Sequence, residues 1–203
     1  MKTNRKLLAG ATLVLGSLTV AAAPGPPTWN VDAAHSAVTF SVRHFFTPVK
    51  GQFDQSEIEL AYDRAAPENS TVRVRIPVAT INTSNERRDN HLKSGDFFEA
   101  EAHPYITFVS ESVTKVSDTE LMMRGALSIK GQVRTIDLPV KILGVVDLAP
   151  AMQEMFGGVK QVASFEATLR LDRRDFGVGV GSWAATAVVG KDVDITISVE
   201  ANR

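Results

Sequence analysis

The densest group of residues that could do chemistry lies between Asn82 and Pro104, in the stretch NTSNERRDNHLKSGDFFEAEAHP. Arg88, Asp89 and His91 are residue types found in general acid–base sites. However, Asp89 and His91 are two positions apart, so on a helix they point to different sides and do not form a pair. The chain also has no cysteine, and no serine lies in a nucleophile turn. The sequence therefore predicts a binding protein with no catalytic residues, not an enzyme.

Metal ligation is the next chemistry to consider. The histidines are His35, His44, His91 and His103, and no two of them have ligand spacing such as His-x-His or His-x-x-x-His. A lone histidine is more often a hydrogen-bonded structural residue than a ligand. The sequence therefore predicts no metal site, and a metal- or electron-transport-linked factor stays open as an alternative.

Aromatic and aliphatic residues spread along the chain are more informative than the polar ones. They fill the core of the protein, or they line an elongated cavity for a lipid tail, and the pattern alone leaves both interpretations open. As the lining of an apolar channel we predict Phe40, Val42, Phe53, Val74, Ile76, Phe97, Phe98, Phe108, Leu127, Ile129, Leu138, Phe165, Phe176 and Trp183.

The elements that must position these residues are strands. Eight runs alternate apolar and polar residues with a period of two and are bounded by turn residues. They follow one another without long helical crossovers, which indicates antiparallel pairing in a sandwich or a closed barrel. The runs cover residues 36–44, 56–63, 71–80, 105–113, 119–129, 134–143, 164–172 and 191–200.

One helix is expected among the strands, over residues 84–94. Thr83 and Glu86 have the spacing of a capping box, which starts the helix at about Ser84, and Gly95 suits the position that ends it. We expect this short helix to lie across one end of the barrel as a cap.

The N-terminus predicts export. Residues 1–22 combine a basic start, a short apolar run and small residues, which is typical of a signal peptide cut after Ala22. Without this leader the chain keeps 19 basic and 23 acidic residues. We therefore expect a soluble periplasmic domain over residues 23–203, with no stable membrane span and no nucleic-acid partner.

The stretches VDAAHSAVTFSVRH, VKGQF, NERRDNHLKSGDFFEAEAHPYITF, LSIKGQVRTIDLPV and RRDFGVG occur in this order. Together they closely resemble the YceI-like family of bacterial periplasmic polyisoprenoid-binding proteins, over roughly residues 29–201. The resemblance implies an all-β fold, an eight-stranded antiparallel lipocalin-like barrel. It also implies non-catalytic binding of a long isoprenoid or related amphiphilic lipid, held non-covalently, with no other cofactor.

The combined prediction is a periplasmic carrier for such a lipid, and the family is compatible with a homodimer. Arg88 and His91 are candidate head-group or gate residues, because they lie on the expected cap; alternatively they only hold the cap in place. The Met-rich segment 149–161 is expected to form a turn at the rim of the channel. A stress-related or interaction module with a filled barrel is the main alternative function.

Overall fold

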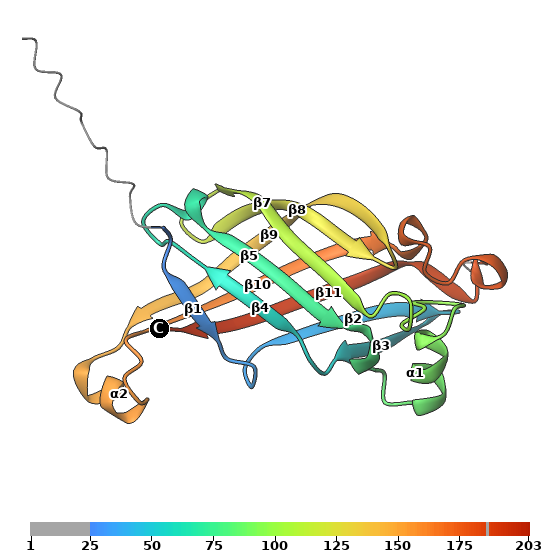
Figure 1. The fold of residues 1–203 in the computed structure, drawn as a ribbon, viewed down its shortest axis with the longest axis horizontal. Helices are drawn as coiled ribbons and strands as arrows, with labels where there is room; N and C mark the ends of the chain where they lie inside the picture. The colour runs from blue at the N-terminus through green and yellow to red at the C-terminus, as the bar shows by residue number, and fades with distance from the viewer. Residues whose placement is uncertain (1–24, 186) are drawn as a thin grey trace, which may run out of the picture.

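The computed structural model describes residues 25–185 and 187–203, and the predicted signal peptide lies outside the described residues. The described part consists mostly of antiparallel strands (Figure 1). The strands are β1 (Thr28–Val31), β2 (Ala37–His44), β3 (Thr47–Phe53), β4 (Glu57–Ala61), β5 (Thr71–Pro77), β6 (Ile81–Asn82), β7 (Tyr105–Lys115), β8 (Glu120–Ile129), β9 (Gln132–Asp147), β10 (Gln161–Asp172) and β11 (Val189–Asn202).

Eight of these strands form a closed ring in the order β1-β4-β5-β7-β8-β9-β10-β11, and β11 pairs back with β1. Long β11 pairs with β1 at its C-terminal end and with β2 along the rest of its length. β3 and β6 extend the sheet from β2. The prediction of an all-β, eight-stranded antiparallel barrel is confirmed.

One of the eight strands in the ring is not the strand that the sequence predicts. The short β1 closes the ring, whereas the predicted run over residues 36–44 forms β2 beside it. Four residues are too few to give a clear alternating pattern, although Trp29 at the centre of β1 is only 3% exposed. The same shortness hides β6, and β3 has Gly51 in the middle of its inward face, which weakens its alternating pattern.

Strand β8 illustrates why the alternating runs form the barrel wall. Leu121, Met123, Leu127 and Ile129 occupy one face and are buried, while their neighbours are more exposed. Burying such side chains contributes about 1.5–3 kcal/mol each. The same alternation in the other long strands produces a single apolar interior.

Helix α1 (Glu86–Lys93) starts two residues later than the sequence predicts. The N-cap is Asn85, whose side-chain oxygen accepts a hydrogen bond from the Arg88 backbone N–H at 3.0 Å. Thr83 is not the cap, because its hydroxyl hydrogen-bonds instead to Asp89 Oδ1 at 2.5 Å. Two candidate caps only two residues apart explain the error, since asparagine caps as well as threonine.

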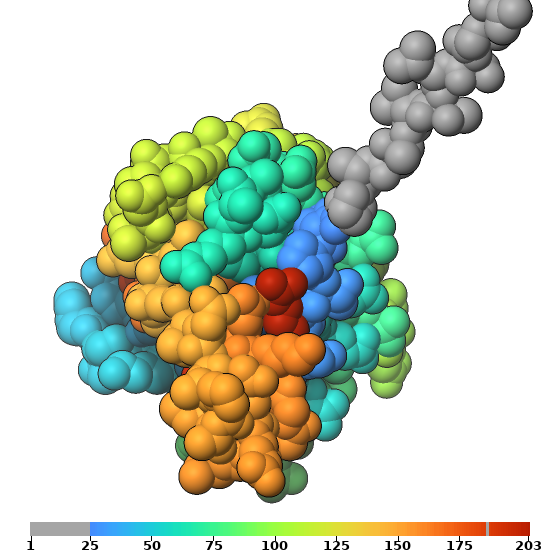
Figure 2. Space-filling model, turned by 90° about the vertical axis from the view of Figure 1, so that its left-hand side faces the viewer, coloured from blue at the N-terminus to red at the C-terminus, as the bar shows by residue number. Residues whose placement is uncertain are grey.

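Helix α1 and helix α2 (Pro150–Met155) lie at opposite ends of the barrel, here called the α1 end and the α2 end (Figure 1). Figure 2 views the α2 end, where the blue N-terminal strand, the red C-terminus and the orange segment around α2 pack side by side. Within residues 25–185 and 187–203 there are also four short 3₁₀ turns: η1 (Pro67–Asn69), η2 (Val78–Thr80), η3 (Arg173–Phe176) and η4 (Gly181–Trp183). No helix in the described ranges is long and apolar enough to cross a membrane.

Candidate functional site

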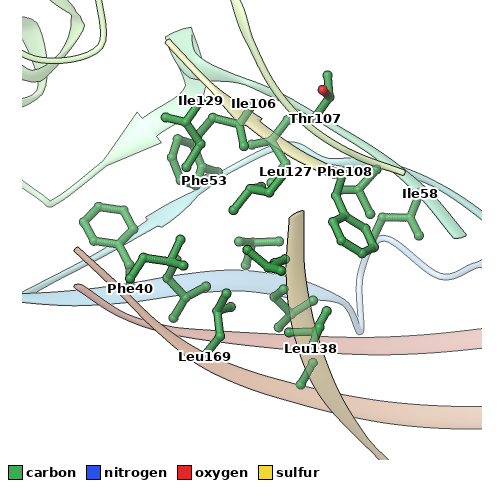
Figure 3. A pocket seen from close by; sticks show the side chains of 18 of the residues that line it. Phe40, Phe53, Ile58, Ile106, Thr107, Phe108, Leu127, Ile129, Leu138 and Leu169 are labelled. Atoms are coloured by element: carbon green, nitrogen blue, oxygen red, sulfur yellow. The ribbon is translucent and has the colours of Figure 1, made fainter. Parts of the chain in front are cut away.

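The barrel encloses a cavity of about 250 Å³ that runs along its interior. Figure 3 shows side chains from several strands, among them Phe40, Leu127 and Leu138, directed towards this shared space. On this measure one water-sized group occupies roughly 10–15 Å³, so the cavity has room for on the order of 20 non-hydrogen atoms. The void disagrees with the filled-barrel alternative drawn from the sequence.

Twelve of the fourteen predicted channel residues line this cavity; that they bind a ligand stays a prediction. They come from five strands of the ring (β5, β7, β8, β9 and β10), from the adjoining β2 and β3, from the segment after α1 and from η3. They are Phe40, Phe53, Val74, Ile76, Phe97, Phe98, Phe108, Leu127, Ile129, Leu138, Phe165 and Phe176.

The predictions for Val42 and Trp183 are wrong as to position, because neither side chain is part of the cavity lining. Val42 has the inward register of Phe40 near the end of β2, but it is only half-buried and does not line the cavity, although its pairing partner Val193 does. Trp183 lies outside the wall and packs against Phe97, with the ring centroids 5.8 Å apart. The strand pattern gives the inward face of Val42 but not whether it reaches the cavity, and no strand pattern covers Trp183, which lies in η4.

Polar side chains at the cavity are few, and among its described lining residues they are Tyr62, Ser70, Thr107 and Arg173. Ser70 Oγ accepts the Asp63 N–H at 3.0 Å. Thr107 lies next to the wall, and Figure 3 shows its hydroxyl turned away from the cavity. No carboxylate or histidine side chain is among the described residues that line the cavity. The interior therefore suits an apolar chain and offers no general acid–base pair.

Arg173 is the charged lining residue among those that were not predicted from the sequence. It is 5% exposed and lies among carbonyl groups of the connection from η3 to β11. Its guanidinium donates to the carbonyl oxygens of Val178 at 2.8 Å, Trp183 at 2.8 Å, Val189 at 3.1 Å and Gly190 at 2.9 Å, and also to that of Gly179. Burial lowers the pKa of Arg173 from its ordinary value. This side chain thus fixes the loop that covers the α1 end.

Gly179 explains the glycine-rich sequence of that loop. Its φ is +62°, and a Cβ placed there would lie 2.6 Å from Arg173 Nη1 and 2.7 Å from Phe97 Cε1. Only glycine allows the loop backbone to approach both side chains so closely. The loop is therefore a packed cover over Phe97, and Phe97 in turn lines the cavity.

The α1 end is covered by a helix and loops, not by paired strands. Leu92 of α1 and the Phe97–Phe98 pair close the cavity from one side, and Phe176 and Val178 from the other. Closure by side chains on short irregular segments is easier to open than closure by a hydrogen-bonded ladder.

His91 connects these two covers. Its Nε2 lies 2.8 Å from Asp96 Oδ2, and the Trp183 indole N–H donates to the same oxygen at 3.2 Å. The hydrogen bonds from His91 and Trp183 lower the pKa of Asp96. The His91 ring also packs edge-on against Phe97 and Trp183, with centroid distances of 5.1 and 5.0 Å. His91 thus joins α1 to the 173–190 loop and does not reach the cavity.

Arg88 holds α1 from its other end. Its Nε donates to Thr83 Oγ1 and its Nη2 to the Thr83 carbonyl oxygen, both at 2.7 Å. Like His91, it is not part of the cavity lining. The geometry therefore gives both residues a role in holding the cap, and a contact with a ligand head group stays a prediction.

The α2 end is closed by aromatic packing. Tyr62 lines the cavity and packs edge-on against Phe165 at 5.0 Å, and the buried Trp29 donates its indole N–H to the Tyr62 carbonyl oxygen at 2.9 Å. Burial raises the pKa of Tyr62. Because the β1–β11 ladder lies over these rings, this end is tied by backbone hydrogen bonds.

One cluster outside the cavity has the donor set of a metal site. Asp32, His35 and Glu200 each place one ligand atom within 4.8 Å of the others. His35 Nδ1 lies 2.8 Å from Asp32 Oδ2, and this contact lowers the pKa of Asp32 and raises that of His35. Asp32 and His35 are exposed, and each already has the other as a hydrogen-bond partner without a metal ion. Residues 32 and 200 are far apart in sequence, so spacing alone did not reveal the cluster.

A comparison with models of known protein families shows which family the chain belongs to. The model of the YceI-like domain matches residues 29–201. The chain belongs to the YceI-like family. The resemblance predicted from the sequence is thereby confirmed.

Other YceI-like and related proteins match over most of their length. A UPF0312 protein of Staphylococcus aureus is 34% identical over 172 residues, which cover 83% of this chain and 94% of the relative. The structure of Burkholderia cenocepacia BcnA superposes with a TM-score of 0.74 and 24% identity, over 84% of this chain and 99% of that one. A domain from Saccharophagus degradans, described as polyisoprenoid-binding, gives a TM-score of 0.62 at 14% identity, over 86% and 97%. The two structures share the fold with this YceI-like protein.

Proposed function

We propose that this YceI-like protein binds the tail of a long isoprenoid, or of a related amphiphilic lipid, in the barrel cavity and carries it through the periplasm without chemical change. The observation that supports the proposal most strongly is the continuous apolar cavity along the barrel axis. The wall has few polar side chains and contains no carboxylate or histidine among the described residues, so it offers little to a polar ligand. The polyisoprenoid-binding description of the Saccharophagus domain and the predicted export signal agree with the proposal.

The cavity volume defines the size of the bound part. Room for on the order of 20 non-hydrogen atoms corresponds to about four five-carbon units of one chain. Each buried CH₂ contributes ~0.8 kcal/mol, or about 16 kcal/mol for such a tail before the costs of association are subtracted. Those costs are about 4–15 kcal/mol. The balance is favourable by about 1–12 kcal/mol, so tail burial alone favours binding, and contacts of the head group add to it.

We further propose that the lipid enters at the α1 end. The cover there consists of α1 and the 173–190 loop, joined through His91, Asp96 and Trp183, whereas the α2 end is tied by the β1–β11 ladder. The tail would then lie towards Tyr62 and the head group near Phe97 and Phe98.

Equilibrium uptake tests this function. The purified protein is mixed with a radiolabelled prenyl alcohol of about 20 carbons dispersed in dilute detergent, and the protein-bound label is counted after gel filtration. We expect saturable uptake of one chain per protein, with tighter binding than for a prenyl alcohol half as long. No saturable uptake of either chain by folded protein would refute the proposal.

A further inference from the structure

Two phenylalanines at the tip of the β2–β3 hairpin are exposed to solvent. Phe46 is 92% exposed and Phe45 is 52% exposed. They form the two-residue turn between His44 and Thr47, which are paired across the hairpin. The hairpin points away from the barrel at the α1 end (Figure 1). Large apolar side chains this exposed at a protruding tip are typical of a contact surface.

The backbone at the tip has an unfavourable conformation. Phe45 has a φ of +50°, a left-handed conformation that a bulky side chain rarely adopts. Glycine or asparagine would relieve the strain at such a two-residue turn. Phe45 therefore gives neither a buried side chain nor a relaxed turn, so its benefit to the protein lies elsewhere.

The tip is also basic. The segment from residue 43 to residue 50, RHFFTPVK, contains Arg43 and Lys50 and no acidic residue. Neither side chain takes part in an ion pair within the described residues. Two cations beside two exposed aromatic rings match the chemistry of an anionic bilayer surface, where apolar rings enter below the head groups and cations bind the phosphates.

The tip is connected to the cavity cover by direct contacts. The Phe45 backbone N–H donates to the Val188 carbonyl oxygen at 2.8 Å, and His44 pairs with Val189. The Val189 carbonyl oxygen in turn accepts a hydrogen bond from Arg173, which lines the cavity. A surface that docked on Phe45 would therefore lie beside the cover of the α1 end.

The α2 end offers an internal comparison. Met155 and Phe156 there are 78% and 54% exposed, so they present similar apolar groups. However, the segment from residue 150 to residue 156 contains Glu154 and no basic residue. This segment therefore lacks the cations that would hold its apolar groups on an anionic membrane, whereas the β2–β3 tip combines apolar and basic groups beside the cavity cover.

We propose that the tip of the β2–β3 hairpin, Arg43 to Lys50, docks the protein on an anionic lipid bilayer and presents the α1 end of the cavity to it. The inference rests on the proposed function, because a lipid carrier must load and unload at a membrane. It adds the surface used for that step and the kind of membrane that it recognises.

Vesicle flotation tests the docking. The purified protein is mixed with vesicles of phosphatidylethanolamine and phosphatidylglycerol, or with vesicles of phosphatidylcholine alone. We expect binding to the anionic vesicles that weakens with added salt, and about fivefold weaker binding for each of Arg43→Gln and Lys50→Gln. Phe45→Ser/Phe46→Ser should lower vesicle binding at least tenfold, and the matched Met155→Ser/Phe156→Ser should leave it unchanged. Because these side chains are exposed, all variants should melt close to the wild type.

The uptake assay separates docking from cavity binding. From detergent dispersion, Phe45→Ser/Phe46→Ser should take up the prenyl alcohol like the wild type, whereas uptake from anionic vesicles should be at least tenfold slower. Absence of vesicle binding by the wild type would overturn the docking proposal, and so would equal binding by the wild type and the hairpin variant. Failure of uptake from detergent would instead refute the proposed function.

Discussion

Replacing Ala167 by phenylalanine would block the cavity from within. Ala167 lies in the middle of β10, is 6% exposed, and faces the interior beside its pairing partners Val140 and Ile197. The variant adds a phenyl ring to the void without removing any existing contact of the wall.

The size of the effect follows from the cavity volume of about 250 Å³. A phenyl ring occupies the room of about six of the roughly 20 water-sized groups that fit. At ~0.8 kcal/mol per buried carbon, displacing about six tail carbons weakens binding by about 5 kcal/mol before the tail adjusts. A tail that shifts towards one end recovers part of this loss, so we expect the Kd for the prenyl alcohol to rise about a hundredfold or more.

Uptake and thermal unfolding of Ala167→Phe should be measured together, with Ala65→Phe on the exposed surface as the matched control. A hollow barrel accepts the ring, so the variant should melt at or above the wild-type temperature while uptake falls. A filled barrel would instead lose about 1–3 kcal/mol through overpacking. Wild-type uptake by folded Ala167→Phe would refute the assignment of the cavity as the lipid site.

Three further predictions concern the frame around the cavity. Arg173→Met leaves its carbonyl partners unpaired, so denaturant unfolding should show a loss of about 3–5 kcal/mol; a loss below about 1 kcal/mol would contradict the role of Arg173. Gly125→Ala places a Cβ 2.5 Å from Phe108 Cζ, so thermal unfolding should show a cost of about 1–3 kcal/mol, and a neutral effect would argue against this packing. The hydrogen bond from Arg174 lowers the pKa of Asp172 to about 2. The ionised Asp172 therefore stabilises the fold fully above about pH 4, and this contribution is lost as the pH falls through about 2. In Asp172→Asn, the free energy of unfolding should change less with pH over this range than in the wild type. An unchanged pH dependence would contradict the assignment.

The barrel wall could be predicted from the sequence because its residues obey a local rule. Along β8 and β10 every second residue is apolar, and the wall needs only that alternation. The turn Lys130–Gly131 between β8 and β9 is equally local, with both φ values positive. Strand β1 was missed because its place in the ring depends on pairing with residues 201–202, which no local pattern shows.

The ends of the cavity could not be predicted in the same way. The hydrogen bonds of Arg173 reach carbonyl oxygens up to 17 positions away, and carbonyl acceptors leave no mark in a sequence. His91 was found as a polar residue on the cap, but its partner Trp183 comes from a loop 92 positions later. Gly51 has a similar reason, because a Cβ at this position would clash with the ring of Phe40. These contacts join segments that are separated in the sequence, so no local sequence pattern predicts them.

The central claim is that the cavity holds a lipid in the cell. Native mass spectrometry of the protein isolated without detergent tests it most directly. We predict a population whose mass exceeds that of the chain by one isoprenoid or related lipid, which is lost in Ala167→Phe and retained in Ala65→Phe. A bare protein that also takes up no added isoprenoid would contradict the account.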